Sequence, residues 1–402
     1  MKTRSELRIT RIIFVASFLI STAALAMLAL SQPTRTHIAA SYLFGAILVL
    51  GTMAIGSLTG RHRRIFGFIL LVSILNLVFV PAEAYLRFKG FRYESGIQFG
   101  YPRPYQFNVF EPDEKLFWKF PPSAPGVNSY GFRGPEVERP KPRGTYRILY
   151  IGNSCTFQGF PRMVELALRE ENPGVECLNF ANPGYTSHQG RVFVESYIDE
   201  LEPDLVVASY GWNDRWLAYG AVDREKKIRI SGGALTGAVR GINARWRFLQ
   251  FMRRALSPVL GKTAPLESSR VPPGHFSENL RAIGDACSAR SIPVIFATEP
   301  SSHPMLGVPD YVVLSRYASS KEASLALLRE YNDIVRKVAG EKDGRHLIDL
   351  DTRISGRGDV RSIFTGDGLH FSEAGLALVT GIESRFIAER FLETAHHGQR
   401  HR

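Results

Sequence analysis

From residue 146 onward, the sequence alternates between short apolar runs and longer segments with helical spacing. The first run, 147–151, precedes a helix-like segment at 161–171. The remaining expected strands are 175–180, 204–210, 292–298 and 346–350, and the remaining expected helices are 188–200, 277–291, 321–339 and 372–392. Strands that alternate with helices are typical of a parallel sheet covered by helices on both faces. We therefore expect an α/β domain over residues 143–395.

The first 85 residues contain three apolar runs without a charged side chain. They lie at about 12–30, 38–58 and 65–82, and each is as long as a bilayer-spanning helix requires, about 17–25 residues. For the first run the alternative is a cleaved signal peptide, because basic residues precede it and an Ala-Leu-Ala stretch occupies 24–26. Its length and the two further runs favour a membrane anchor of three transmembrane helices over residues 1–86.

The positive charges around these runs predict an orientation. Basic residues gather before the first run and between the second and third, whereas the loop between the first and second holds only Arg35. Those gathered residues are Lys2, Arg4, Arg8, Arg11, Arg61, Arg63 and Arg64. Because basic residues favour the cytoplasmic side, we expect a bacterial plasma-membrane protein with a cytoplasmic N-terminus and a periplasmic catalytic domain. Nucleic acid is then excluded as a partner.

Residues 87–142 are rich in aromatic residues, proline and glycine. Prolines prevent a long helix here, so we expect an irregular linker with one or two short strands that packs on the following domain. Within it, Asn128 and Arg133 lie among glycines in the stretch NSYGFRG. This stretch is either a tight turn or part of a substrate-binding site.

A basic insertion at 215–270 interrupts the alternation of strands and helices. It holds twelve Lys and Arg residues against three Asp and Glu, and so carries +9 of the net charge of +12. Between 244 and 262, arginines interleave with Trp246, Phe248 and Met252, as in a basic amphipathic helix on an anionic membrane surface. A lid over a cleft, a groove for an acidic glycan and a helix packed on its own domain remain alternatives.

Four polar stretches follow or precede expected elements in a way that would bring them together. They are 152–154 (Gly-Asn-Ser), 181–184 (Ala-Asn-Pro-Gly), 211–214 (Gly-Trp-Asn-Asp) and 367–370 (Asp-Gly-Leu-His). The first alone is ordinary turn sequence. In a parallel sheet, however, all four loops lie at the carboxyl edge, where ligands bind. Their combination therefore indicates an active site.

The residue types in these stretches suit nucleophilic catalysis. A serine hydroxyl needs a base, which His370 can provide, and Asp367 lies three residues earlier, close enough to orient the imidazole. The backbone N–H groups of Ser154 and Gly184 and the side-chain amide of Asn213 could bind the oxyanion. The chemistry requires no cofactor, and the sequence contains no metal-ligand cluster or phosphate-binding motif.

Three further residues are candidates for substrate contact. Asn153 and Trp212 belong to the stretches just described, and aromatic rings such as that of Trp212 can stack on sugars. His303 follows the fourth expected strand and so lies at the same edge. For each of them, a role in a loop or in packing is the alternative.

In this order, the four stretches resemble those of the SGNH (GDSL-like) hydrolase family over about 147–385. The GxND and DxxH motifs are intact at 211–214 and 367–370, whereas Asn153 stands where the family usually has Asp. The resemblance implies a flavodoxin-like three-layer α/β/α sandwich with a central parallel sheet. It also implies Ser154 as nucleophile, Gly184 and Asn213 as oxyanion-hole residues, and Asp367 with His370 as acid and base.

Together, the resemblance and the anchor predict a membrane-anchored serine esterase. Its expected substrate is an O-acetyl or other short acyl ester on a cell-envelope carbohydrate or lipid, in association with envelope polysaccharide machinery. One alternative is an O-acyltransferase that uses the same triad with a polysaccharide acceptor. A non-catalytic envelope scaffold is the other. The sequence leaves the substrate and the oligomeric state open.

Overall fold

The computed structural model describes residues 79, 82–91, 110–227, 242, 246–256 and 265–392. They belong to two compact units, of which the larger contains 110–227 and 265–392. The three runs expected to cross the membrane lie outside the described residues, apart from 79 and 82. Among the helices of the described ranges, none is both long and apolar enough to cross a bilayer.

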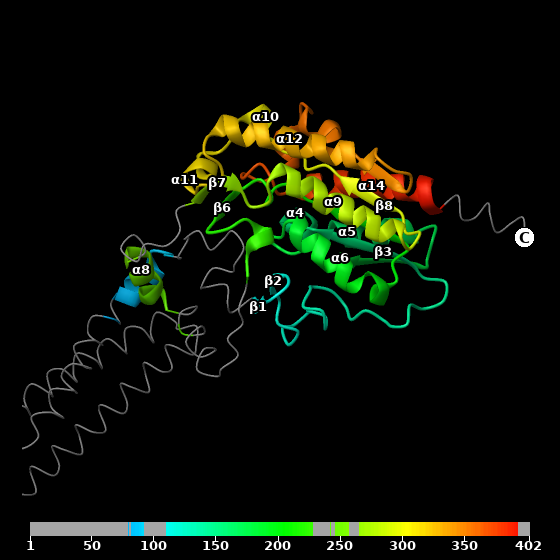
Figure 1. The fold of residues 1–402 in the computed structure, drawn as a ribbon, viewed down its shortest axis with the longest axis horizontal. Helices are drawn as coiled ribbons and strands as arrows, with labels where there is room; N and C mark the ends of the chain where they lie inside the picture. The colour runs from blue at the N-terminus through cyan, green and yellow to red at the C-terminus, as the bar shows by residue number, and fades with distance from the viewer. Residues whose placement is uncertain are drawn as a thin grey trace, which may run out of the picture. The chain divides into compact units, whose positions relative to one another are not determined.

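A five-stranded parallel sheet lies at the centre of the larger unit (Figure 1). In spatial order its strands are β4 (Val175–Asn179), β3 (Tyr146–Gly152), β5 (Leu205–Ser209), β8 (Val294–Ala297) and β9 (Arg345–Ile348). The first strand of the sheet in the chain, β3, thus lies between the second and third. This order creates a topological switch point between β3 and β5, which is where such sheets bind ligands.

Alternating side chains of β3 explain why helices cover both faces of the sheet. Leu149 and Ile151 contribute to one apolar core, and Ile148 and Tyr150 to the other. The first core contains residues of α6 (Ser187–Leu201), α9 (Pro273–Ser288) and α12 (Lys321–Ala339). The second contains residues of α5 (Phe160–Arg169) and α14 (Glu373–Ile387). Since strand side chains alternate between faces, the result is the expected α/β/α sandwich.

Short helices complete the larger unit. They are α4 (Ser154–Phe157), a 3-10 helix (Asp223–Glu225), α10 (His303–Leu306), α11 (Asp310–Leu314), a π-helix (Asp351–Ser355), α13 (Val360–Ile363) and a π-helix (Ala388–Leu392). The last of these continues α14, so the expected helix at 372–392 is an α-helix with a π-helical end. α14 begins where the Ser372 hydroxyl accepts the Gly375 N–H at 3.1 Å, a typical N-cap.

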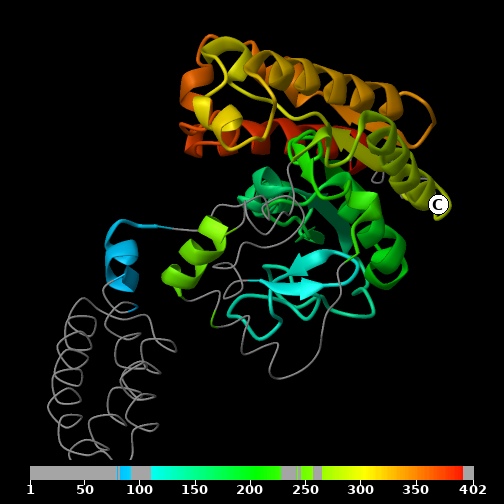
Figure 2. The ribbon, with the colours of Figure 1, turned by 60° about the vertical axis from the view of Figure 1, so that its left-hand side comes forward.

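Residues 110–142 contain the antiparallel strands β1 (Glu111–Asp113) and β2 (Phe117–Lys119), drawn in cyan in Figure 2. Gln189 of α6 donates to the carbonyl of Leu116 at 2.9 Å, and Tyr185 donates to that of Trp118 at 2.5 Å. Phe132 is fully buried in the core that contains α6. This segment is therefore part of the folded unit and adds a layer beside α6.

The two ends of the basic insertion pair with each other. Strands β6 (Leu217–Tyr219) and β7 (Pro265–Ser269) form an antiparallel ribbon that the sequence did not predict. Each strand is short, and nothing in its local pattern reveals a partner about fifty residues away. The insertion thus leaves and re-enters the larger unit at one place.

The smaller unit contains α8 (Arg247–Leu256) and a helical segment at 82–88. The rings of Phe79 and Phe248 lie 4.4 Å apart, and the carboxylate of Glu83 accepts the N–H of Phe248 at 2.7 Å. Phe91 contacts Phe251 with their ring centroids 5.9 Å apart. The basic helix of the insertion therefore packs on the segment that follows the third apolar run.

Candidate active site

Ser154, His370 and Asp367 form one hydrogen-bonded chain at the carboxyl edge of the sheet. Ser154 begins α4 directly after β3, and His370 lies in the loop before α14. The Nε2 atom of His370 is 2.9 Å from Ser154 Oγ, and its Nδ1 atom is 2.6 Å from Asp367 Oδ2. The side chains of Asp367 and His370 are each 33% exposed. The expected catalytic residues thus meet where a substrate can reach them.

The Asp367 carboxylate is held by its own loop. Its Oδ1 atom accepts the N–H groups of Leu369 and His370 at 2.9 and 3.0 Å and the hydroxyl of Thr365 at 2.8 Å. Burial opposes ionisation, but the hydrogen bonds from His370 and Leu369 outweigh it and hold the pKa of Asp367 well below its usual range. An ionised Asp367 keeps the imidazole oriented and can stabilise the imidazolium.

Two backbone N–H groups remain available for an oxyanion. Within the described residues, those of Ser154 and Gly184 donate to no other group. Gly184 has φ of 82°, and a Cβ there would lie 2.9 Å from the ring of Trp118, so only glycine fits. Arg270 donates to its carbonyl at 2.8 Å and pairs with Asp223 at 2.9 Å, both side chains being fully buried. Unpaired, fixed donors are what oxyanion stabilisation requires.

The loop after β5 adds a side-chain amide and its support. Asn213 Nδ2 donates one hydrogen to the carbonyl of Tyr185 at 2.9 Å, and an amide nitrogen has a second hydrogen to donate. Asp214 accepts the N–H groups of Ser187 and Gly211 at 2.8 and 3.2 Å, which ties this loop to the start of α6. Burial raises the pKa of Asp214 to about 7.

Residues 149–378 match the sequence pattern of the GDSL-like Lipase/Acylhydrolase family. The chain belongs to this family. It is accordingly an ester-hydrolysing enzyme, and its parallel sheet is that of the SGNH fold.

Solved structures of similar fold include a lipase/acylhydrolase of Enterococcus faecalis, 18% identical, with 61% of this chain and 97% of that chain covered and a TM-score of 0.40. They also include an acetylxylan esterase of Geobacillus stearothermophilus, 15% identical, with 61% and 95% covered and a TM-score of 0.38. Among curated proteins, none matches the sequence of this GDSL-like hydrolase.

Two candidates for substrate contact in this hydrolase are buried and contact other groups of the protein. Asn153 is fully buried: its Oδ1 accepts the Cys155 N–H at 2.9 Å and its Nδ2 donates to Glu299 at 2.7 Å. Trp212 is 3% exposed, and the Arg215 guanidinium lies 3.9 Å from its ring centroid. The structure therefore corrects the expectation for both, since both side chains are buried.

The two candidates in the NSYGFRG stretch differ. Asn128 is buried, and its Oδ1 accepts the N–H groups of Tyr130 and Phe132 at 3.2 and 3.1 Å. It is the turn residue of the alternative interpretation, and its expected substrate contact is wrong in this structure. Arg133 is exposed, with its guanidinium 5.2 Å from the ring of Phe157 on α4. It remains a candidate beside the nucleophile helix.

His303 is buried and contacts the loop that carries Asp367. It is 1% exposed, and its Nε2 atom lies 2.9 Å from the carbonyl of Asp367. Burial lowers the pKa of His303, which favours a neutral imidazole. The interpretation as a loop histidine is therefore the better one.

The sequence analysis missed two buried residues of the site. Glu299 contacts Asn153 behind the nucleophile, and Arg270 holds the Gly184 carbonyl. An acidic residue shortly after a strand that ends at the active edge was a usable signal for Glu299. Arg270 gave no such signal, because its role depends on a tertiary pair with Asp223.

A cavity of about 540 Å³ adjoins the catalytic loop. Its lining includes Ser302, Pro309, Lys321, Arg361, Thr365 and Gly368. Small-molecule sites have volumes of about 300–1,000 Å³, so this cavity is large enough to hold part of a substrate beside Asp367.

Proposed function

We propose that this enzyme is a membrane-anchored serine esterase that removes O-acetyl or other short acyl groups from an extracytoplasmic carbohydrate or lipid ester. The hydrogen-bonded chain of Ser154, His370 and Asp367, with its spacings of 2.9 and 2.6 Å, is the observation that carries the chemistry. These are the distances at which a base can take a proton from a nucleophile.

In the proposed reaction, Ser154 Oγ attacks the ester carbonyl while His370 Nε2 takes its proton. The oxyanion forms near the N–H groups of Ser154 and Gly184 and the amide of Asn213. His370 then returns the proton to the leaving alcohol, which departs and leaves an acyl-serine. Water attacks this ester with His370 as base again, and the acid and free Ser154 are released.

Turnover of p-nitrophenyl acetate by the full chain in detergent micelles tests the esterase. We expect Ser154→Ala to lower kcat by about 10⁴–10⁶-fold, because the nucleophile is gone and nothing else changes shape. Ser362→Ala, at an exposed position of α13, is the matched control and should keep the wild-type rate. Equal turnover by Ser154→Ala and wild type would remove Ser154 from the mechanism.

Transfer of the acyl group to a sugar hydroxyl uses the same residues with a different acceptor. The cavity beside Thr365 and Gly368 gives such an acceptor a place to bind. Incubation with an acetyl donor and a glycan separates the two reactions: free acetate supports the esterase, and an acetylated glycan supports transfer. Envelope polysaccharide machinery would supply either substrate.

Membrane anchorage through residues 1–86 is part of the proposal. Besides the three uncharged runs, the smaller unit presents large apolar side chains to solvent: Tyr85, Phe88, Phe251 and Leu256 are 42–73% exposed. Arg254, also exposed, lies beside them over the ring of Phe91. Aromatic and basic side chains together suit the interface of an anionic membrane, directly after the third run.

Fusions to alkaline phosphatase, which is active only outside the cytoplasm, test this topology. We expect activity when the reporter follows residue 86 and none when it is joined within 61–64, because the positive charges of that loop favour the cytoplasm. The opposite pattern would contradict both the orientation and the periplasmic location of the active site.

A further inference from the structure

The carboxylate of Glu299 lies behind the nucleophile. In the sheet, Gly152 pairs with Ser209, and Ser209 pairs with Ala297, so the ends of β3, β5 and β8 are level. Glu299 follows Ala297 by two residues, and its side chain crosses the end of β5. Its Oε1 atom accepts the Ser209 hydroxyl at 3.1 Å and Asn153 Nδ2 at 2.7 Å.

The Asn153 side chain connects Glu299 to the turn that carries Ser154. Its Oδ1 atom accepts the Cys155 N–H at 2.9 Å and so caps α4, whose first residue is Ser154. Because Oε1 of Glu299 accepts the hydrogen bond from Nδ2, Glu299 fixes which end of the amide points inward, and this leaves Oδ1 to hold the turn that carries Ser154.

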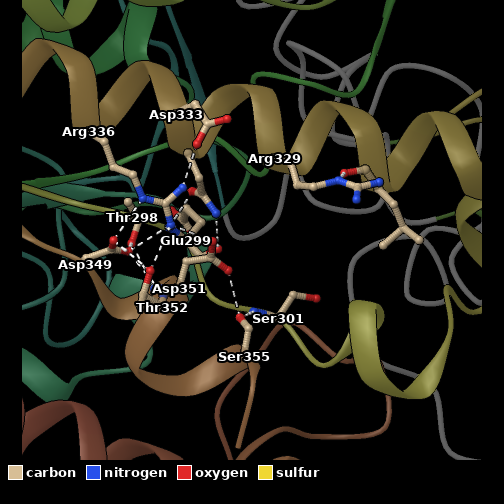
Figure 3. A network of polar contacts seen from close by, with 12 residues as sticks. Thr298, Glu299, Ser301, Arg329, Asp333, Arg336, Asp349, Asp351, Thr352 and Ser355 are labelled. Carbon is tan, nitrogen blue, oxygen red and sulfur yellow. Dashed lines mark hydrogen bonds and ion pairs between the residues drawn. The ribbon is translucent and has the colours of Figure 1, made fainter.

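The backbone of Glu299 is itself fixed on both sides. Asn332 of α12 accepts the Glu299 N–H at 2.9 Å and donates to its carbonyl at 3.0 Å. Figure 3 shows the flanking contacts, in which the Thr298 hydroxyl donates to Asp349 at 2.9 Å and the Ser301 N–H to Ser355 at 2.9 Å. The side chain of Glu299 thus projects from a rigid loop.

The same loop also contacts the segment that carries the base. The Ser301 hydroxyl donates to the carbonyl of Gly368 at 3.1 Å, and His303 Nε2 lies 2.9 Å from that of Asp367. Residues 298–303 therefore touch the nucleophile turn through Glu299 and the His370 loop through two other side chains. A single loop sets the relative position of both.

We propose that Glu299 is a positioning residue for ester hydrolysis. It holds the side chain of Asn153 in place, and Asn153 in turn keeps Ser154 at hydrogen-bond distance from His370. It acts through Asn153 and touches no reacting atom. The kinetic part of the proposal rests on the serine mechanism proposed above.

Because Glu299 is buried, the charge of the side chain at position 153 should strongly affect the contact between them. Burial raises the pKa of Glu299 to about 7, opposed by the hydrogen bonds from Asn153 and Ser209. Asp214, Arg215, Cys155 and Tyr210 are close enough to act on it electrostatically. Glu299 forms no ion pair with any side chain of the ranges described. A second carboxylate at position 153 would lie at about the present 2.7 Å contact distance, where two acids share one proton and repel once both ionise.

An exchange of the two groups tests the proposal. Asn153→Asp should keep most of its activity at about pH 6 and lose at least about tenfold in kcat relative to wild type by about pH 9. In the double variant Asn153→Asp/Glu299→Gln, the amide at position 299 can again donate a hydrogen bond to the carboxylate at position 153. This variant should recover to within about fivefold of wild-type kcat at about pH 9. Glu299→Ala should lower kcat by about 100-fold with KM nearly unchanged, as expected for a misplaced nucleophile.

A buried carboxylate elsewhere in the unit provides the control. Glu383→Gln on α14 should leave the pH profile of kcat unchanged. A double variant no more active than Asn153→Asp at about pH 9 would overturn the proposal, as would wild-type kcat in Glu299→Ala.

Thermal unfolding gives a readout that needs no activity. Above about pH 7, Asn153→Asp should unfold at a lower temperature than the double variant, because only the single variant holds two facing carboxylates. Equal unfolding temperatures would contradict the pairing. A wild-type chain without esterase activity would instead refute the proposed function and leave this result standing.

Discussion

The buried charges nearest Ser154 and those at the amino edge of the sheet are treated in opposite ways, although one buried ion pair, Arg270 with Asp223, also lies near the active site. At the amino edge, the fully buried Arg147 pairs with Glu176 at 2.6 Å and donates to the carbonyls of Leu201 and Glu138 at 2.8 and 3.1 Å. Beside the nucleophile, Glu299, Asp214 and Arg215 are equally buried. Among the described residues, however, none of these three forms an ion pair.

Burial shifts the protonation of the unpaired groups. It raises the pKa values of Glu299 and Asp214 to about 7 and lowers that of Arg215 to about 9. Unpaired charges cost stability, and shifted groups gather at functional sites. The comparison suggests that the amino edge is built to hold the sheet together and that the carboxyl edge accepts a cost for orienting catalytic groups.

Removing the charge of Asp367 at the carboxyl edge should mainly cost activity. Asp367→Asn would leave the shape of the loop but lose the carboxylate that orients His370, so kcat/KM should fall by about 10⁴-fold. Steady-state kinetics with p-nitrophenyl acetate measures this. Asp359→Asn, an exposed acid paired with Arg357, is the control. A loss below about tenfold would show that His370 works without its carboxylate partner.

Removing a charge at the amino edge should do the reverse. Arg147→Leu would leave the carboxylate of Glu176 without its partner and should lower the free energy of unfolding by about 3–5 kcal/mol. The kcat of the folded fraction should stay unchanged. Denaturant unfolding measures the loss, and Arg281→Leu, from an exposed pair, should change stability by less than about 1 kcal/mol. If Arg147→Leu were as stable as wild type but had a reduced kcat, the proposed difference between the two edges would be wrong.

Substitutions of uncharged asparagines at the two edges test the same difference between an edge that supports catalysis and one that supports the fold. Asn213→Ala removes a proposed oxyanion donor, so kcat should fall by about 100–1,000-fold with KM nearly unchanged. Asn172→Ala, in the turn before β4 at the amino edge, should keep wild-type kcat. If the two variants turned over ester equally well, the oxyanion role of Asn213 would have to be abandoned.

The change in folding stability with pH should be a smaller effect than those of the substitutions above, and it should come from buried acids. Burial raises the pKa of Asp214 to about 7 and that of Glu383 to about 8. A raised folded-state pKa stabilises most below the unfolded value, near pH 4, and this stability is lost as the pH rises to about 8. The slope for one group is at most about 1.4 kcal/mol per pH unit.

Unfolding midpoints measured between about pH 5 and 8 should therefore decline, and Glu383→Gln should flatten the decline. A variant that leaves the decline unchanged would assign it to other groups.

The sequence predicted the sheet well because its three central strands are short, mostly apolar runs that are buried on both faces. α12 has the expected bounds, since Ser320 caps its start and Gly340 ends it. The stretches that carry Ser154, Gly184, Asn213 and His370 could be found because they directly follow or precede such elements. Here local pattern and strand order suffice.

The remaining features depend on contacts between distant parts of the chain. Asn153 and Glu299 are 146 positions apart and meet only because β5 lies between β3 and β8. Trp212 likewise packs against the ring of His303, a residue from a loop much later in the chain, with their ring centroids 5.5 Å apart. Local sequence gives residue types and spacing but not which side chain covers which, so the substrate-contact assignments were the least accurate.

Trp118 has a practical consequence for anyone who trims this enzyme. Its indole lies against Gly184 and donates to the carbonyl of Pro183 at 3.2 Å, although it lies outside the family-matched region 149–378. A recombinant fragment cut to that region would remove the indole from the peptide that carries the proposed oxyanion donor, Gly184, and would expose apolar surface of α6. The same cut would remove the start of β3 and the end of α14, so an inactive fragment would say nothing about the triad.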